Sequence, residues 1–585
     1  MLLEISARKP FHCEPCRQPS EENSNTPHHG VVLIAAGAGI FSLVKAEGLP
    51  PYPLAEPDYS SKRQLDFSAF EAALSGLDPN RIAVMDTLVA EVTLLELQVL
   101  MNNGQFSAEE LVTYYVQRIR AYDMDKLNSV LELNPEALAF ARDLDVERAA
   151  GTVRSPMHGI PVLFKDNIAT GEGMHTTAGA WAMRDWQPSR DAFLVSQLRE
   201  AGAIVLGKTN LSEWANYMDV DMPNGFSVLG GQTRNPYGPY GTLGSSSGSA
   251  VAAAANFAAV TVGTETQGSI ILPAKINGVV GLKTSRGLVS RDHILPLVDW
   301  MDVPGPIGRT VSDVAVMLSA MTDEDEKDLV TFDAVEVAGT DYTQFLVAEN
   351  AVGKKLGIVV QDNAFIDQMI ADFELGEDSA SQFRQAMIQS NDKVRMQATP
   401  FVDIGIELVE VSAAAMPSTP DLSAFIDYGF RSALDAFLTD LSDEAPVRSL
   451  AEIVDINSAD SDNRAPYGQG YLESAMKSPL TPDEYAAQVA ESMSVADDLG
   501  SLFEAYALDV LLSDSQIYAA TGFPALTVPA GYGEDGQPEG IILIGDFLGE
   551  DNLIIIGYAY EQATQARQMP DLDKTISEID SMVNR

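Results

Sequence analysis

Residues 241–286 (GTLGSSSGSAVAAAANFAAVTVGTETQGSIILPAKINGVVGLKTSR) constrain the fold of this chain more than any other segment. A serine cluster between glycines (244–248) precedes an alanine-rich run (249–259), which predicts a tightly packed helix whose first free N–H groups face the serines. Residues 260–262 predict a short buried strand, and 263–269 predict a turn that presents backbone N–H groups beside the hydroxyl of Ser269. Such donors can hold an oxyanion, so the turn indicates acyl-transfer chemistry. Taken alone, the serine cluster or the 263–269 turn also fits a glycine-rich turn whose hydroxyls cap a helix.

Together the two halves resemble the signature of the amidase signature family, which runs close to GGSSGGS, an alanine-rich helix and GTDTGGSIRxPA. Upstream, residues 159–167 (GIPVLFKDN) are similar to the family's GIPxxxKDN. The resemblance implies a catalytic set of Lys165, Ser245 and Ser269, in which Ser269 is the nucleophile and Ser245 follows a cis peptide bond. It gives Ser246 a supporting role. It also implies an oxyanion hole made by the backbone N–H groups of Thr266, Gln267, Gly268 and Ser269.

The implied reaction is the hydrolysis of a carboxamide through an acyl-enzyme, with no metal or other cofactor. Neutral Lys165 takes a proton from Ser245, which relays it from Ser269. Lys165 also follows a short apolar strand expected at residues 159–164, where burial disfavours the ammonium form and lowers the lysine pKa. Without the serine motifs, a lysine that extends from the strand end or pairs with Asp166 would be the simpler interpretation.

Two positions depart from the family pattern: Gln267 stands in place of a glycine and Ile271 in place of an arginine. The variant is similar to the peptide amidase branch, as are residues 212–216 (SEWAN) and 127–138 (LNSVLELNPEAL). This similarity implies C-terminally amidated peptides or small carboxamides as substrates. A non-catalytic protein of the same fold that binds peptides is the alternative from another class, and the presence of all three triad residues weighs against it.

Two further patterns suggest other chemistry. Residues 244–248 satisfy GxSxG, the nucleophile elbow of α/β-hydrolases, with Ser246 as nucleophile of an esterase. That reading needs a downstream acid and histidine, and His293 is the only histidine after residue 175. Residues 202–209 satisfy the P-loop pattern GxxxxGK[ST], but their four central residues are apolar and predict a buried strand instead of an exposed phosphate-binding loop.

The rest of the chain predicts an α/β fold. A capping box at Ser107–Glu110 opens a helix, residues 127–132 predict a strand, and 135–149 predict a helix that crosses back. The resemblance implies one amidase signature domain over residues 87–585, with a twisted mixed β-sheet between helical layers. Residues 47–86, rich in proline and tyrosine before helical periodicity starts near Thr87, predict a linker packed on the domain surface.

The amino-terminal segment predicts a leader. The apolar run at residues 31–44 is short for a transmembrane helix and is followed by small residues up to Ala46, so 1–46 are expected to be a secretory leader of a secreted or periplasmic enzyme, or otherwise a retained anchor or a cytoplasmic extension. Cys13 and Cys16 lie within it, and no thiol follows. The formal net charge, 37 − 84 = −47, argues against nucleic acid or an anionic membrane as a partner.

Overall fold

The computed structural model of the chain describes residues 56–583. The predicted leader at residues 1–46 therefore lies outside the described residues, and it stays a prediction. Among residues 56–583, no helix combines the length and the apolar content that crossing a lipid bilayer requires.

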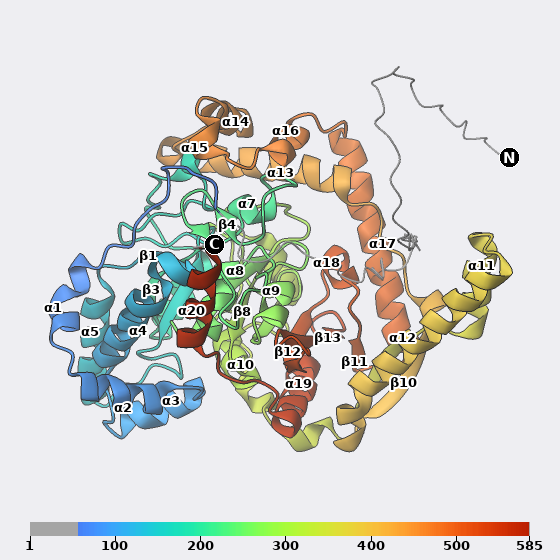
Figure 1. The fold of residues 1–585 in the computed structure, drawn as a ribbon, viewed down its shortest axis with the longest axis horizontal. Coiled ribbons are helices and arrows are strands. Elements are labelled where there is room, and N and C mark those ends of the chain that lie inside the picture. Colours follow the sequence, from blue (N-terminus) through green and yellow to red (C-terminus); the bar gives the residue numbers. More distant parts are fainter. Residues whose placement is uncertain (1–55, 584–585) are drawn as a thin grey trace, which may run out of the picture.

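Apolar runs rich in valine, isoleucine and leucine form the strands of one large sheet, which crosses the molecule in Figure 1. These strands are β1 (Val130–Leu133), β2 (Pro161–Lys165), β3 (Ile204–Thr209), β6 (Val260–Glu265), β7 (Val280–Lys283), β8 (Val303–Gly308), β9 (Lys355–Val360), β10 (Glu407–Ser412), β11 (Val510–Leu512), β12 (Ala525–Tyr532) and β13 (Pro538–Gly545). The eleven strands lie in the order β1-β3-β2-β6-β8-β7-β12-β13-β11-β9-β10. A separate ribbon pairs β4 (Phe226–Ser227) with β5 (Gly231–Gln232).

The sheet is mixed, as predicted. β2 runs parallel to both of its neighbours, β3 and β6, and β9 runs parallel to β10 and β11. Antiparallel strands β8, β7, β12 and β13 join these two parallel groups. All residues of β2, β3 and β6 are buried, as expected for strands covered on both faces.

Helices pack against the sheet and complete the single α/β domain. The alanine-rich helix α8 (Ser247–Ala254) contacts β2, β3, β6 and β8, and α9 (Ile271–Ile276) contacts β7, β12 and β13. α10 (Val311–Ser319) contacts β6, β7 and β8, and α19 (Glu550–Thr564) contacts β11, β12 and β13. All eight residues of α8 are buried. Their small side chains let the helix pack closely against the sheet.

Further helices surround this core. They are α3 (Leu94–Asn102), α4 (Ala108–Tyr122), α5 (Ala137–Ala149), α6 (Phe193–Glu200), α7 (Glu213–Asn216), α11 (Asn363–Asp372), α12 (Glu377–Asp403), α13 (Ser423–Asp440), α14 (Leu450–Ser458), α15 (Ser461–Arg464), α16 (Gly470–Met476), α17 (Pro482–Tyr506), α18 (Ile517–Thr521) and α20 (Leu572–Val583). Figure 1 shows α13 to α17 arching over the top of the view, whereas α11 and α12 project at its right edge.

The expected linker at residues 47–86 is more regular than predicted. Its described part contains a 3₁₀ turn (Ser68–Phe70), α1 (Glu71–Ser75) and the start of α2 (Pro79–Val89). Asp78 caps α2 by accepting a hydrogen bond from the Asn80 N–H, and Pro79 suits the first helical position. The prediction that regular structure starts near Thr87 is therefore wrong, since the proline- and tyrosine-rich composition hid these short helices.

Candidate active site

Lys165 is the last residue of β2, and it ends inside the protein with no exposed surface. Its Nζ atom lies 2.7 Å from Ser245 Oγ, 2.9 Å from Thr264 Oγ1 and 3.0 Å from the Thr264 carbonyl oxygen. Asn167, two residues further along the chain, donates from Nδ2 to Thr264 Oγ1 at 3.1 Å. The strand that the sequence predicts therefore brings the lysine to a serine 80 residues away.

Burial dominates the protonation of Lys165. Loss of hydration lowers the pKa of the lysine from 10.5 to about 7, although the negative charges of Asp302 and Glu265 oppose this effect. Near neutral pH, Lys165 is therefore a neutral amine in a large fraction of the enzyme molecules. The neutral amine is the form that can accept a proton.

Ser245 lies in the serine cluster directly before α8. The peptide bond between Gly244 and Ser245 is cis. A Cβ atom on Gly244 would lie 2.3 Å from Ser212 Oγ, so only glycine fits at this position. Ser212, from the SEWAN segment, donates its backbone N–H to the Ser245 carbonyl at 3.1 Å. The serine cluster and the SEWAN segment therefore form one packed unit.

Ser246 points into the protein. Its hydroxyl donates to the Thr264 carbonyl at 3.0 Å and accepts from the Thr264 N–H at 3.2 Å. His293, the other residue that the α/β-hydrolase reading requires, instead packs edge-on against Trp186 with ring centroids 5.8 Å apart. Burial lowers the pKa of His293 to about 4. The geometry therefore gives the Ser246–His293 alternative no support, because the Ser246 hydroxyl is bonded to the backbone of Thr264, which also contacts Lys165.

Ser269 lies in the turn between β6 and α9. It is 7% exposed, and its carbonyl accepts the backbone N–H of Ser246 at 3.1 Å. The buried carboxylate of Glu265 holds this turn from inside, where it accepts the N–H groups of Gly268 at 2.7 Å, Ile270 at 2.7 Å and Ile271 at 2.9 Å. Such multiple hydrogen bonds to one carboxylate fix the backbone on both sides of Ser269.

The oxyanion-hole prediction needs one correction. The N–H of Gly268 already donates to Glu265, so it is not available to a substrate oxygen. Gly268 has φ +78°, and a Cβ there would lie 2.7 Å from Leu272 Cδ1, so this glycine serves the shape of the turn. Thr266, Gln267 and Ser269 remain candidate backbone donors. Gln267 is the exposed residue of the turn, which explains why a side chain replaces glycine there without steric conflict.

The P-loop pattern forms a buried strand, as predicted. Residues 204–209 of the pattern make up β3, and Lys208 donates to Thr176 Oγ1 at 2.8 Å and lies 3.7 Å from Asp166 Oδ1. Lys208 therefore bonds inside the protein and does not face an open phosphate-binding loop. Within residues 56–583, no group of three or more His, Cys, Asp or Glu side chains is arranged to hold a metal ion.

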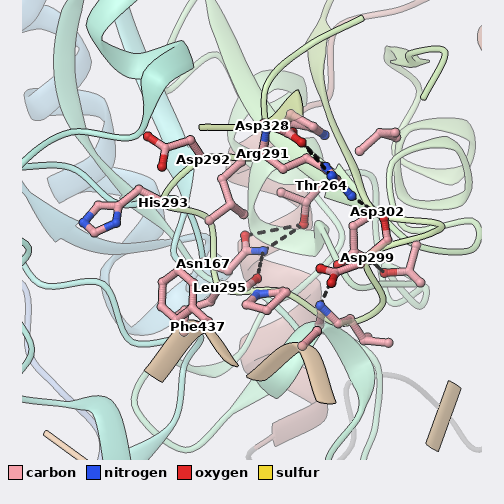
Figure 2. A pocket seen from close by; sticks show the side chains of 18 of the residues that line it. Asn167, Thr264, Arg291, Asp292, His293, Leu295, Asp299, Asp302, Asp328 and Phe437 are labelled. Carbon is pink, nitrogen blue, oxygen red and sulfur yellow. Dashed lines mark hydrogen bonds and ion pairs between the residues drawn. The ribbon is translucent and has the colours of Figure 1, made fainter. Parts of the chain in front are cut away.

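A cavity of about 290 Å³ lies next to Thr264, which contacts Lys165 Nζ (Figure 2). Asn167, Thr264 and Thr266 form its wall on the side of the site, and α13 contributes Ala433, Ala436, Phe437 and Asp440. The segment 291–304 supplies most of the remaining wall, where Arg291 is paired with Asp328 at 2.7 Å. Sequence reasoning missed Asn167, Thr264 and the 291–304 wall, although the first two lie inside motifs that it used.

The sheet brings a buried lysine of lowered pKa within hydrogen-bond distance of a serine hydroxyl, an arrangement that can serve hydrolytic chemistry. Comparison with known proteins agrees. The Amidase family model matches residues 110–374. A probable amidase from Arabidopsis thaliana is 36% identical over 493 residues, which are 82% of this chain and 92% of the relative.

Two solved structures extend the likeness. An amidase family protein from Bacillus anthracis superposes with a TM-score of 0.78 at 37% identity, covering 88% of this chain and 100% of that one. The native peptide amidase from Stenotrophomonas maltophilia superposes with a TM-score of 0.72 at 37% identity, covering 83% of this chain and 99% of that one. The chain belongs to the amidase signature family, and it is a hydrolytic amidase and not merely a binding protein of the same fold.

Proposed function

We propose that this amidase cleaves its substrate through Ser269, with Ser245 as proton relay and Lys165 as base. The neutral Lys165 amine takes a proton from Ser245 Oγ, which takes the proton of Ser269 Oγ as that oxygen attacks the amide carbon. The C–N bond then breaks, the same relay returns the proton to the leaving amine, and an ester of Ser269 remains. Water, activated by the same relay, hydrolyses the ester to the carboxylic acid.

The observation that carries this proposal is the 2.7 Å contact between Lys165 Nζ and Ser245 Oγ in a fully buried setting. A base must lie within hydrogen-bond distance of the proton it removes and must be unprotonated at the working pH. Lys165 meets both conditions, because its pKa is lowered to about 7. The bond from Ser246 N–H to the Ser269 carbonyl supports the relay, since it ties the turn of Ser269 to the residue next to Ser245.

For the substrate, we propose C-terminally amidated peptides or small carboxamides. The likeness to a protein described as a peptide amidase supports this class. The cavity is also consistent with it, because it combines apolar walls from α13 and Leu295 with polar and charged side chains.

The test begins with purified enzyme and a panel of peptide amides, fatty amides and anilides, with the released amine identified. We expect peptide amides to be cleaved with release of ammonia, and Ser269→Ala to lose at least about 10⁴-fold in kcat without loss of fold. Ser247→Ala is a matched control, because its hydroxyl donates to the Leu243 carbonyl and not to the site. A covalent acyl label that mass spectrometry maps to a serine other than Ser269 would overturn the proposal.

A further inference from the structure

Asp302 lies between three parts of the site, namely the turn of residues 266–269 that carries Ser269, the cavity, and the surroundings of Lys165. It immediately precedes β8, whose first residue Val303 pairs with Glu265, the last residue of β6. Continued by one step, this antiparallel register puts Asp302 opposite Thr266, which lies three residues before Ser269. Asp302 lines the same cavity as Thr264 and Thr266, and Figure 2 labels it beside Asp299.

Each carboxylate oxygen of Asp302 holds a different segment. Oδ1 accepts the Thr266 hydroxyl at 2.5 Å, and Oδ2 accepts the backbone N–H groups of Leu297 at 2.6 Å and Val298 at 2.9 Å. Asp302 therefore fastens the cavity wall at 297–298 to the turn that carries Ser269. Glu265 holds the same turn from inside through Gly268, so the turn is fixed from two sides.

Two negative charges among the described residues act on the Lys165 ammonium, those of Asp302 and Glu265. Asp302 in turn lies near Asp299, Arg291 and the phenol of Tyr485, and Arg291 is already paired with Asp328. Glu265 accepts backbone N–H groups and lies near Lys283 and the phenol of Tyr518, whereas one oxygen of Asp302 accepts the Thr266 hydroxyl in the turn that carries Ser269.

We propose that Asp302 is a positioning residue of the amidase reaction: it orients the Ser269 turn through the Thr266 hydroxyl and supplies an anionic charge that acts on Lys165. The inference rests on the proposed roles of Ser269 and Lys165. Asp302 then affects both the geometry of the candidate oxyanion donors in residues 266–269 and the pKa of Lys165.

Two substitutions test the charge of Asp302 and the hydroxyl of Thr266 independently. Asp302→Asn keeps the shape and can still bond Thr266, Leu297 and Val298, but it removes the negative charge. Burial raises the pKa of Asp302 to about 6, so its carboxyl is mostly charged at pH 7, where Lys165 titrates. Because a negative charge favours the ammonium form, its loss makes Lys165 more acidic. The acid limb of activity should therefore move to lower pH by at least about half a unit. Thr266→Val keeps the charge and removes the hydroxyl, so we expect a fall in kcat of about tenfold with the limb in place.

The measurement does not depend on the natural substrate. A sulfonyl fluoride forms a sulfonyl ester with a nucleophilic serine and releases fluoride, and its inactivation rate against pH reports how readily Ser269 loses its proton. Asp299→Asn is the matched control for charge, because Asp299 lines the same cavity but is not one of the two charges that act on Lys165; its limb should stay within about 0.2 pH units of wild type. Thr266→Ser, which restores a hydroxyl, should recover the rate that Thr266→Val loses.

The outcomes separate this inference from the proposed function. A sulfonyl label on a serine other than Ser269 overturns the proposed function, whatever Asp302 does. If Ser269 is labelled but Asp302→Asn shifts the limb no more than Asp299→Asn, Asp302 is a structural residue only and the inference is wrong. Should Asp302→Asn fail to fold, the Thr266→Val and Thr266→Ser pair still decides, because equal rates for both would exclude orientation through the hydroxyl.

Discussion

The pH dependence of the enzyme should follow the protonation of Lys165. Burial lowers the pKa of this lysine from 10.5 to about 7, so at pH 8 about 90% of it is neutral, against about 0.3% for a lysine of ordinary pKa. The difference, roughly 300-fold in the concentration of active base, is what the buried site contributes. At pH 6 only about 10% is neutral, so kcat/KM should fall by nearly tenfold between pH 8 and pH 6, and its logarithm should approach a slope of one per pH unit below about pH 6. Activity should persist into alkaline pH.

The assay is kcat/KM against pH for the wild type, Lys165→Ala and Lys165→Arg, with one peptide amide. We expect both variants to lose several orders of magnitude, and we expect arginine to give no rescue because the guanidinium stays charged throughout the range. His293 serves as an internal control, since its pKa of about 4 would place a histidine-dependent limb well below that of Lys165. An arginine variant with near-normal activity, or a wild-type limb centred near pH 4, would refute the role of Lys165 as base.

Two further predictions concern stability. Between pH 7 and 10.5 the unfolded chain binds a proton at Lys165 that the folded enzyme does not, so the lysine makes stability rise with pH across that window. The melting temperature of Lys165→Met, relative to wild type, should therefore be higher at pH 7 than at pH 10 by thermal denaturation, and equal differences would contradict the burial argument. Ser246→Ala removes the hydroxyl that bridges the N–H and the carbonyl of Thr264, and it should cost about 1–3 kcal/mol in denaturant unfolding while measurable amidase activity remains. Complete loss of activity in a folded Ser246→Ala protein would return Ser246 to consideration as nucleophile.

Local patterns were enough to predict the elements that carry the site. The apolar run before Lys165 and the strand inside the P-loop pattern form as expected, because each is a short buried run with a clear boundary. The valine-rich run after α8 also forms a strand, but β6 continues to Glu265, so residues 263–265, expected in the turn, lie in the sheet. The alanine-rich helix differs in length too: α8 ends at Ala254 instead of continuing to residue 259. Asn256 adopts φ +57°, so the chain leaves the helix through a left-handed turn to enter β6. Alanine content alone does not reveal such a turn.

The contacts that tune the site could not be predicted in the same way. The bond of Asn167 to Thr264 spans 97 residues, and Asp302 meets Thr266 only because β6 pairs with β8 in one particular register. The error about Gly268 has the same origin. A glycine beside a nucleophile indicates a free N–H, but the carboxylate that takes this N–H belongs to Glu265, inside the same motif, and its inward direction follows from the burial of β6.

Counting hydrogens around Lys165 indicates which way its proton moves. An ammonium has three N–H groups and can donate to all three neighbours of Nζ, namely Ser245 Oγ, Thr264 Oγ1 and the Thr264 carbonyl. The neutral amine has two N–H groups and one lone pair, so one neighbour must become a donor. The carbonyl has no hydrogen, and the Thr264 hydroxyl has its own acceptor in Asn167 Oδ1 at 3.4 Å. Ser245 is thus the neighbour best able to direct its O–H to the lysine. Its oxygen lone pairs then face away from Nζ. In the proposed relay, this orientation would let Ser245 take a proton from Ser269 at the moment its own moves to Lys165.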